Sequence, residues 1–150
     1  MKGCEVCPEQ NKDINVIVEL CAMHAAYEKS EYDMAGKASK LEKAIFSYSP
    51  TLFCFVAESE GKVVGYLTAT KEFSTWDAEY FLHMDCLYLL ENIRGSGVGS
   101  LFIKTLQEYA INSSCTHIQW QTPVDNFTAI NFYEKQGAIS KDKKRFYLSL

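Results

Sequence analysis

The chain has 150 residues, of which 47% are hydrophobic and 13% aromatic, and its formal net charge at pH 7 is −4. This length predicts a single domain over residues 1–150 that is large enough to bury a core. The composition excludes disordered and collagen-like proteins. The acidic balance argues against nucleic acid as the main partner and suits a cationic ligand.

No segment approaches the roughly 20 apolar residues that a membrane span needs, and the N-terminus lacks the apolar run of a signal peptide. We therefore expect a cytoplasmic protein without membrane contact, whose six cysteines are reduced thiols. Cys4 and Cys7 form a C-x-x-C pair, but no second C-x-x-C or H-x₃-H completes a zinc site. The sequence thus predicts no metal centre.

The first part of the chain alternates between strand and helical patterns. Apolar residues recur at helical spacing from Val16 to Tyr27, whereas the middle of the chain is rich in β-branched and aromatic residues. The predicted elements, in chain order, are a strand at 4–7, helices at 16–27 and 37–46, and strands at 52–58, 63–73 and 79–90.

Helical periodicity returns after a glycine cluster, and strict alternation after that. The predicted elements are a helix at 98–109, a strand at 116–122, a helix at 126–136 that Gly137 ends, and a last strand at 144–150. The order β-α-α-β-β-β-α-β-α-β predicts an α/β protein with a mixed sheet.

The glycine cluster "RGSGVG" (94–99) stands between a long strand and a helix. The first amides of a helix have no intrahelical partners and carry partial positive charge, so this junction suits a phosphate group. Arg94 adds a positive charge, and Ser96 and Ser100 add hydroxyl donors. The spacing excludes a P-loop, and the mid-chain position disfavours a Rossmann fingerprint.

"RGSGVG" followed by an amphipathic helix resembles the acetyl-CoA pyrophosphate loop of the GNAT N-acetyltransferases. "DNFTAINFYEKQGA" (125–138) resembles the next motif of that superfamily. The resemblance implies the GNAT fold: a mixed, mostly antiparallel central sheet with a splayed central strand, flanked by about four helices. "HAAYE", "FSTWD" and the strand before the loop are most similar to the diamine acetyltransferase branch, in which we expect homodimers.

The same resemblance implies acetyl-CoA as the cofactor. The residues of the pyrophosphate loop would be Arg94, Gly95, Ser96, Gly97, Val98, Gly99 and Ser100. The strand residues Leu87, Tyr88 and Leu89 would pair with the pantetheine arm through their main chain. Asn126 would touch the cofactor or its bound water, and Tyr133 would lie near the thioester sulfur.

Transfer of acetyl to an amine needs a base, because alkylamines are mostly cationic at neutral pH. Successive side chains of a strand point to opposite faces, so the strand 79–90 is predicted to place Asp85 and His83 on the same face, unless a bulge intervenes. The residues predicted on the other face are Tyr80, Leu82, Met84, Cys86, Tyr88 and Leu90. A carboxylate in an apolar strand is costly unless it is paired or useful. Asp85 is therefore the candidate base, and a buried structural carboxylate is the alternative. His83 is a second candidate, or packs against Asp85.

The resemblance qualifies this assignment, because the diamine branch has a glutamate at the position of Asp85 and usually a second acid at that of Cys86. Cys86 is rejected as a nucleophile because its side chain is predicted on the face opposite Asp85. Tyr133 is the candidate proton donor to the leaving thiolate; the alternative is a core aromatic on an amphipathic helix.

Two acidic and two aromatic residues are candidates for an amine-binding mouth. They are Tyr27, Glu28, Trp76 and Asp77. The alternative for the carboxylates is a solvated helix end and an exposed loop. The sequence thus predicts an acetyl-CoA-dependent N-acetyltransferase acting on a small-molecule primary amine by direct attack in a ternary complex. A protein or peptide N-acetyltransferase and a non-catalytic acyl-CoA-binding sensor remain alternatives.

Overall fold

The computed structural model describes residues 3–150. The chain forms two compact units, one ending at Trp120 and the other spanning Gln121–Leu150. Each unit is considered by itself below.

The first unit is built on a five-stranded sheet with the order β1-β2-β3-β4-β5. The strands are β1 (Glu5–Pro8), β2 (Phe53–Ser59), β3 (Lys62–Ser74), β4 (Glu79–Leu89) and β5 (Ile118–Gln119). Neighbours pair antiparallel except for β4 and β5, which are parallel. The predicted mixed, mostly antiparallel sheet is confirmed; β5, however, pairs at two positions only and is shorter than the predicted strand 116–122.

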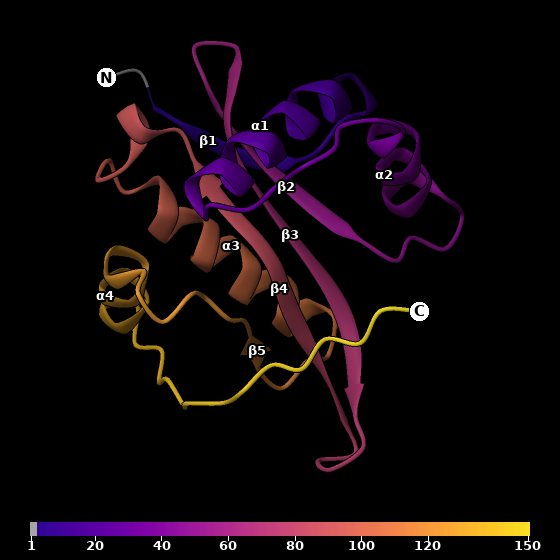
Figure 1. Cartoon of the computed structure of the whole chain (residues 1–150), viewed down its shortest axis with the longest axis vertical. Coiled ribbons are helices and arrows are strands. Elements are labelled where there is room, and N and C mark those ends of the chain that lie inside the picture. The colour runs from indigo at the N-terminus through magenta and orange to yellow at the C-terminus, as the bar shows by residue number, and fades with distance from the viewer. Residues whose placement is uncertain (1–2) are drawn as a thin grey trace. The chain divides into compact units, whose positions relative to one another are not determined.

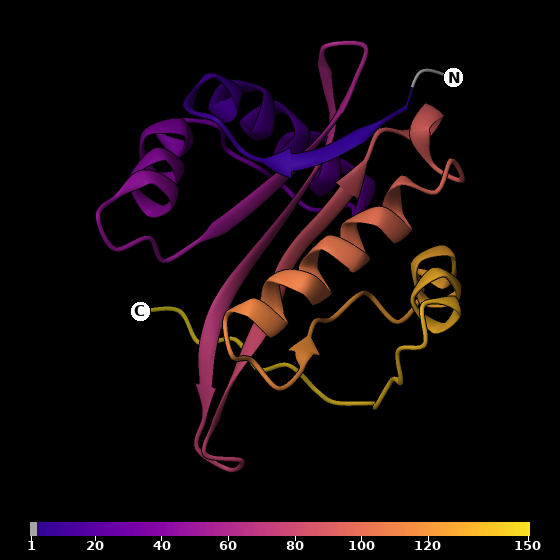
Figure 2. The same ribbon diagram turned by 180° about the vertical axis from the view of Figure 1, so that it is seen from behind.

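Helices cover both faces of this sheet (Figures 1 and 2). The helical elements of the unit are η1 (Asn11–Asp13), α1 (Ile14–Tyr27), α2 (Lys37–Phe46), η2 (Glu91–Ile93) and α3 (Val98–Asn112). Helices α1 and α2 lie on one face and α3 on the other. Helix α1 forms because Ile14, Ile17, Val18 and Leu20, all buried, recur at three- and four-residue spacing.

The core under α1 joins this helix to the three central strands. Its buried members are Ile17, Leu20, Cys54, Val56, Tyr66 and Tyr88. Tyr66 and Tyr88 face each other across β3 and β4. Gly65 of β3 lies tightly against β4, because an added Cβ would lie 2.7 Å from the Tyr88 carbonyl oxygen. The core therefore fixes the part of β4 that leads to the glycine cluster.

The second unit contains α4 (Phe127–Lys135). Gly137, with φ of +87°, ends the helix as predicted, through bonds from the Gly137 and Ala138 amides to the carbonyls of Glu134 and Tyr133. The predicted last strand at 144–150 is wrong, because these residues form no strand and are exposed. The alternation of "KRFYLSL" cannot make a strand without a partner for its main chain.

Among the described residues, no helix combines the length and the apolar character that crossing a membrane requires.

Candidate active site

A β-bulge at Asp85 sets the geometry of the site. The register runs from Thr68 opposite Cys86 directly to Ala69 opposite Met84, which leaves Asp85 without a partner on β3. A bulge of this kind redirects side chains and is common beside active sites. Asp85 is exposed, so the alternative of a buried structural carboxylate is excluded.

The bulge corrects the predicted faces of β4. Residues opposite each other share a face, so Cys86 and Tyr88 lie with Thr68 and Tyr66 under α1, whereas Met84 lies with Ala69 on the other face. The prediction that Cys86 and Met84 share a face is therefore wrong. The prediction that Cys86 faces away from Asp85 is also wrong.

Cys86 contacts the carboxylate of Asp85: its Sγ lies 3.7 Å from Oδ2, to which the thiol donates. Burial, helped by the negative charge of Asp85, raises the pKa of Cys86 to about 12. A thiol with so high a pKa forms little thiolate, and the thiolate is the nucleophile. Cys86 is thus unsuited to nucleophilic attack for a reason that the sequence did not reveal. His83, paired with Thr70 and half-buried, lies on the same face as Cys86.

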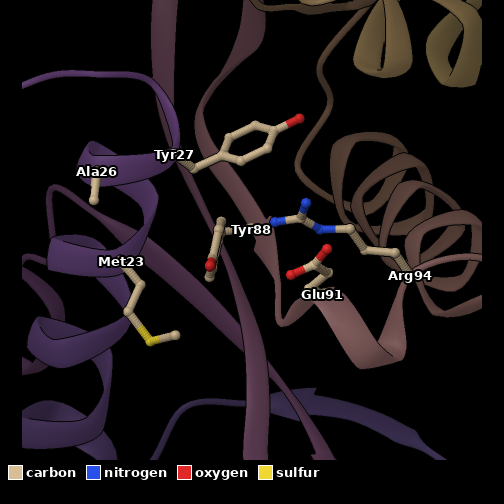
Figure 3. Close-up of a pocket in the computed structure, with 6 residues that line it drawn as sticks. All are labelled: Met23, Ala26, Tyr27, Tyr88, Glu91 and Arg94. Atoms are coloured by element: carbon tan, nitrogen blue, oxygen red, sulfur yellow. The ribbon is translucent and has the colours of Figure 1, made fainter.

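A pocket of about 380 Å³ opens where α1 passes over the end of β4 (Figure 3). Its lining residues are Met23, Ala26, Tyr27, Tyr88, Glu91 and Arg94. The Arg94 guanidinium carbon lies 4.5 Å from the centre of the Tyr27 ring and 5.4 Å from that of Tyr88. Arg94 Nε also donates to the Leu89 carbonyl at 3.0 Å.

A polar chain runs beside this pocket into the core. Glu28 Oε1 lies 3.3 Å from His24 Nε2, and His24 Nδ1 lies 3.0 Å from the hydroxyl of Tyr66. The His24 ring stacks on Tyr88 with centroids 5.2 Å apart. Tyr66 is only 1% exposed, and its burial raises the pKa of its hydroxyl, so it remains a neutral phenol. These contacts hold the wall of the pocket in place.

The glycine cluster fits a phosphate cradle. Gly95 and Gly97 have φ of +78° and +91°, and nothing lies within 4 Å of where their Cβ atoms would stand. The turn therefore leaves its backbone open to a ligand, and L side chains would be strained there. Helix α3 starts at Val98, next to Gly99 and Ser100, so its N-terminus lies at the same end as the cluster. The amide and the hydroxyl of Ser96 both donate to the Ile93 carbonyl.

The four residues of the predicted amine-binding mouth are not brought together within one chain. Tyr27 and Glu28 stand at the end of α1, beside the pocket. Trp76 and Asp77 lie in the turn between β3 and β4, where Asp77 bonds Ser74. That turn is roughly 30 Å from Tyr88 along β4, at about 3.3 Å per residue from Glu79 to Tyr88.

Asn126 and Tyr133 belong to the second unit. The Asn126 side chain accepts a hydrogen bond from the Ala129 amide and so caps the N-terminus of α4, which carries Tyr133. Within the described residues, no group of three or more His, Cys, Asp or Glu side chains is arranged to hold a metal ion.

The sequence prediction did not include several residues of the site. Met23, Ala26 and Glu91 line the pocket, and His24 bridges Glu28 to Tyr66. The four-residue spacing of His24 and Glu28 on a helix was the available signal for that pair.

Comparisons with known proteins agree with this geometry. The model of the acetyltransferase (GNAT) family matches residues 17–138. The chain is 26% identical to a thialysine N-epsilon-acetyltransferase of Mus musculus, over 99% of this chain and 92% of that protein.

Two solved structures share the fold. One is an aminoglycoside acetyltransferase from an uncultured soil metagenomic sample, with a TM-score of 0.83, 18% identity, and coverage of 98% of this chain and 96% of that one. The other is an aminoglycoside N-acetyltransferase in complex with CoA, with a TM-score of 0.83, 15% identity, and coverage of 98% and 95%. With its sheet, its glycine cradle and the family match over most of its length, the chain belongs to the GNAT family of acetyltransferases, which use acetyl-CoA.

Proposed function

We propose that this N-acetyltransferase acetylates a primary amine of a small molecule, and that Asp85 is the base. The observation that carries the proposal is the bulge, which leaves the Asp85 carboxylate exposed on the strand that leads to the glycine cradle. The name of the mouse relative, a thialysine acetyltransferase, supports a small amine as the acceptor.

Acetyl-CoA supplies the acetyl group as a thioester. The amides from Gly95 to Ser100 would hold its pyrophosphate, and the main chain of Leu87–Leu89 would pair with its pantetheine arm. Asp85, directly or through water, takes a proton from the substrate ammonium so that the amine nitrogen has a free electron pair. A new N–C bond then forms, the C–S bond breaks, and the acylated nitrogen releases its second proton to water. Tyr133 would donate its phenolic proton to the thiolate sulfur and regain a proton from solvent.

Direct attack by the amine is the simplest route for these residues. The Asp85 neighbour best placed to carry an acyl group is Cys86, whose raised pKa keeps it a thiol. The chain therefore offers a candidate base on β4, and the thiol in contact with it, Cys86, is not an activated nucleophile, which favours a ternary complex.

The test is release of coenzyme A thiol from acetyl-CoA with diamines, amino acids, aminoglycosides and N-terminal peptides as acceptors. We expect turnover with small amines, and the highest rate with one of the three small-molecule classes. Turnover with peptides alone would instead indicate a peptide acetyltransferase. Tight acetyl-CoA binding without turnover on any acceptor would indicate a sensor.

A further inference from the structure

We propose that Arg94 occupies, in the free protein, the subsite that receives a second cationic group of the acceptor amine. Arg94 vacates this subsite when its guanidinium pairs with a phosphate of the bound cofactor. The inference rests on the proposed function and concerns acceptor amines that carry a second ammonium or guanidinium group.

The first observation is that a cation already lies over the aromatic rings in the wall of the pocket. The Arg94 guanidinium lies over the rings of Tyr27 and Tyr88, and Glu91 stands in the same wall. Aromatic faces attract cations through their quadrupoles, and a nearby carboxylate adds to the attraction. A volume of about 380 Å³ is within the range of small-molecule sites. The pocket is therefore suited to a cation, whether that cation is Arg94 or a ligand.

The second observation concerns the bonds that hold Arg94 there. They are two cation–π contacts and one hydrogen bond, from Nε to the Leu89 carbonyl. Arg94 itself is exposed, and cation–π contacts and hydrogen bonds are weak at exposed sites. Leu89 also belongs to the strand that we expect to pair with pantetheine, so pairing there competes with the Arg94 bond.

A stronger partner for Arg94 is offered at the cradle. Arg94 directly precedes Gly95 and lies three residues before Gly97, the residue that caps α3. Guanidinium–phosphate pairs are charge-assisted and often bidentate, and therefore stronger than the contacts that Arg94 makes in the pocket. The cofactor thus favours the conformation in which Arg94 has left the pocket.

Because the cofactor and the second cation both favour the vacated pocket, their affinities must be coupled. The coupling is positive and reciprocal: each ligand raises the affinity for the other by the same factor. A monoamine, which has no second cation, should show little coupling.

The experiment is calorimetric titration of 1,4-diaminobutane with and without saturating coenzyme A, which has the phosphates but no acetyl group. Coenzyme A should lower the diamine Kd by about 5- to 10-fold, a typical coupling. Butylamine is the control ligand: it has one amine and no second cation, so coenzyme A should change its Kd little. Arg94→Gln should bind the diamine without coenzyme A as tightly as the wild type does with it. Lys71→Gln, which removes another cation from a tyrosine ring, should behave like the wild type.

A second variant tests whether the diamine binds in this pocket. Tyr27→Leu should weaken diamine binding in the presence of coenzyme A while leaving coenzyme A binding intact. A diamine affinity that is independent of coenzyme A, or weaker diamine binding by Arg94→Gln in its absence, would overturn the inference. Neither result would affect the proposed function, which fails separately if Asp85→Asn turns over normally.

Discussion

Two tyrosines of the β3–β4 ribbon each carry a cation over their ring, at opposite ends of the ribbon. Arg94 lies 5.4 Å from the centre of the Tyr88 ring, and Lys71 lies 4.5 Å from that of Tyr80. Tyr88 is 7% exposed and packs under α1, whereas Tyr80 is 48% exposed. We call these the covered end and the distal end.

The difference shows that the contact alone does not make a site. At the distal end, Lys71 donates to the Ser113 carbonyl, Phe73 packs edge-on to Tyr80, and both rings remain near solvent. At the covered end, a helix crosses the ribbon, and the same kind of pair lines a pocket. The two ends differ because at the covered end α1 packs on the ribbon and β4 carries the bulge at Asp85.

The largest expected effect is that of Asp85→Asn. Loss of the base should lower kcat/KM by about 100- to 1,000-fold, as is usual for general base catalysis. The Kd of coenzyme A should not change, because the amide keeps the shape of the bulge. Steady-state kinetics and calorimetry measure the two quantities.

Glu72→Gln is the matched control, since Glu72 is an exposed carboxylate of the same ribbon at its distal end. If Glu72→Gln lowered kcat/KM as much as Asp85→Asn, the activity would depend on the negative charge of the ribbon as a whole and not on the carboxylate at the bulge.

Glu9, which directly follows β1, should make stability depend on pH. Its amide bonds Cys54 of the core, its carboxylate oxygens are buried, and burial, with the charge of Asp13, raises its pKa to about 7. Between pH 4.5 and 7 the folded state binds more protons than the unfolded state, so the free energy of unfolding falls as pH rises. The expected loss is on the order of 3 kcal/mol.

Urea unfolding of the wild type and of Glu9→Gln at pH 5 and pH 8 measures this loss. In Glu9→Gln, the free energy of unfolding should not show the fall between pH 5 and pH 8 that Glu9 causes in the wild type. Equal pH dependence in the two proteins would show that Glu9 titrates normally.

Gly65→Ala should destabilise the covered end by about 1–3 kcal/mol, the usual cost of overpacking. Its Cβ would meet the Leu89 side chain and the Tyr88 carbonyl oxygen, and the carbonyl can retreat only if β4 moves. Thermal unfolding gives the stability change. Gly3→Ala is the control, because nothing lies within 4 Å of that Cβ; the same loss there would point to a general effect of alanine.

Lys71→Gln should have the smallest effect, below about 1 kcal/mol in stability, because its contacts are exposed. Its kcat/KM should equal that of the wild type. A kinetic defect in this variant would mean that the distal end takes part in the reaction, and the contrast between the two ends would fail.

Most elements of the fold were predictable from local patterns. The helix over 37–46 has the bounds that its periodicity indicated, and the strand predicted at 79–90 is β4. The strand predicted at 144–150 failed because strand formation depends on a partner for hydrogen bonding, and alternation does not reveal whether one exists. The strand predicted at 116–122 is correct only at Ile118–Gln119, where β4 provides a partner, for the same reason.

The sequence named three residues that line the pocket, Tyr27, Tyr88 and Arg94, and missed three others, Met23, Ala26 and Glu91. The role of Asp85 as the base stays a prediction. The contact of Cys86 with Asp85 does not follow from the sequence, because a bulge is a mismatch between two strands and is invisible in either strand alone. Likewise, no local pattern indicates the bond of His24 to Tyr66, because it joins residues 42 positions apart.

The bulge also makes Asp85 an insertion in an otherwise regular ladder. Thr68 and Ala69 are consecutive, whereas their partners Cys86 and Met84 are separated by this one residue. Deletion of residue 85 would therefore leave every other pair of β3 and β4 in its present register. A lineage could lose the proposed base in a single three-nucleotide step without disturbing the sheet, and could regain it as easily. Length variation at this one position would then separate active from inactive versions of the same fold.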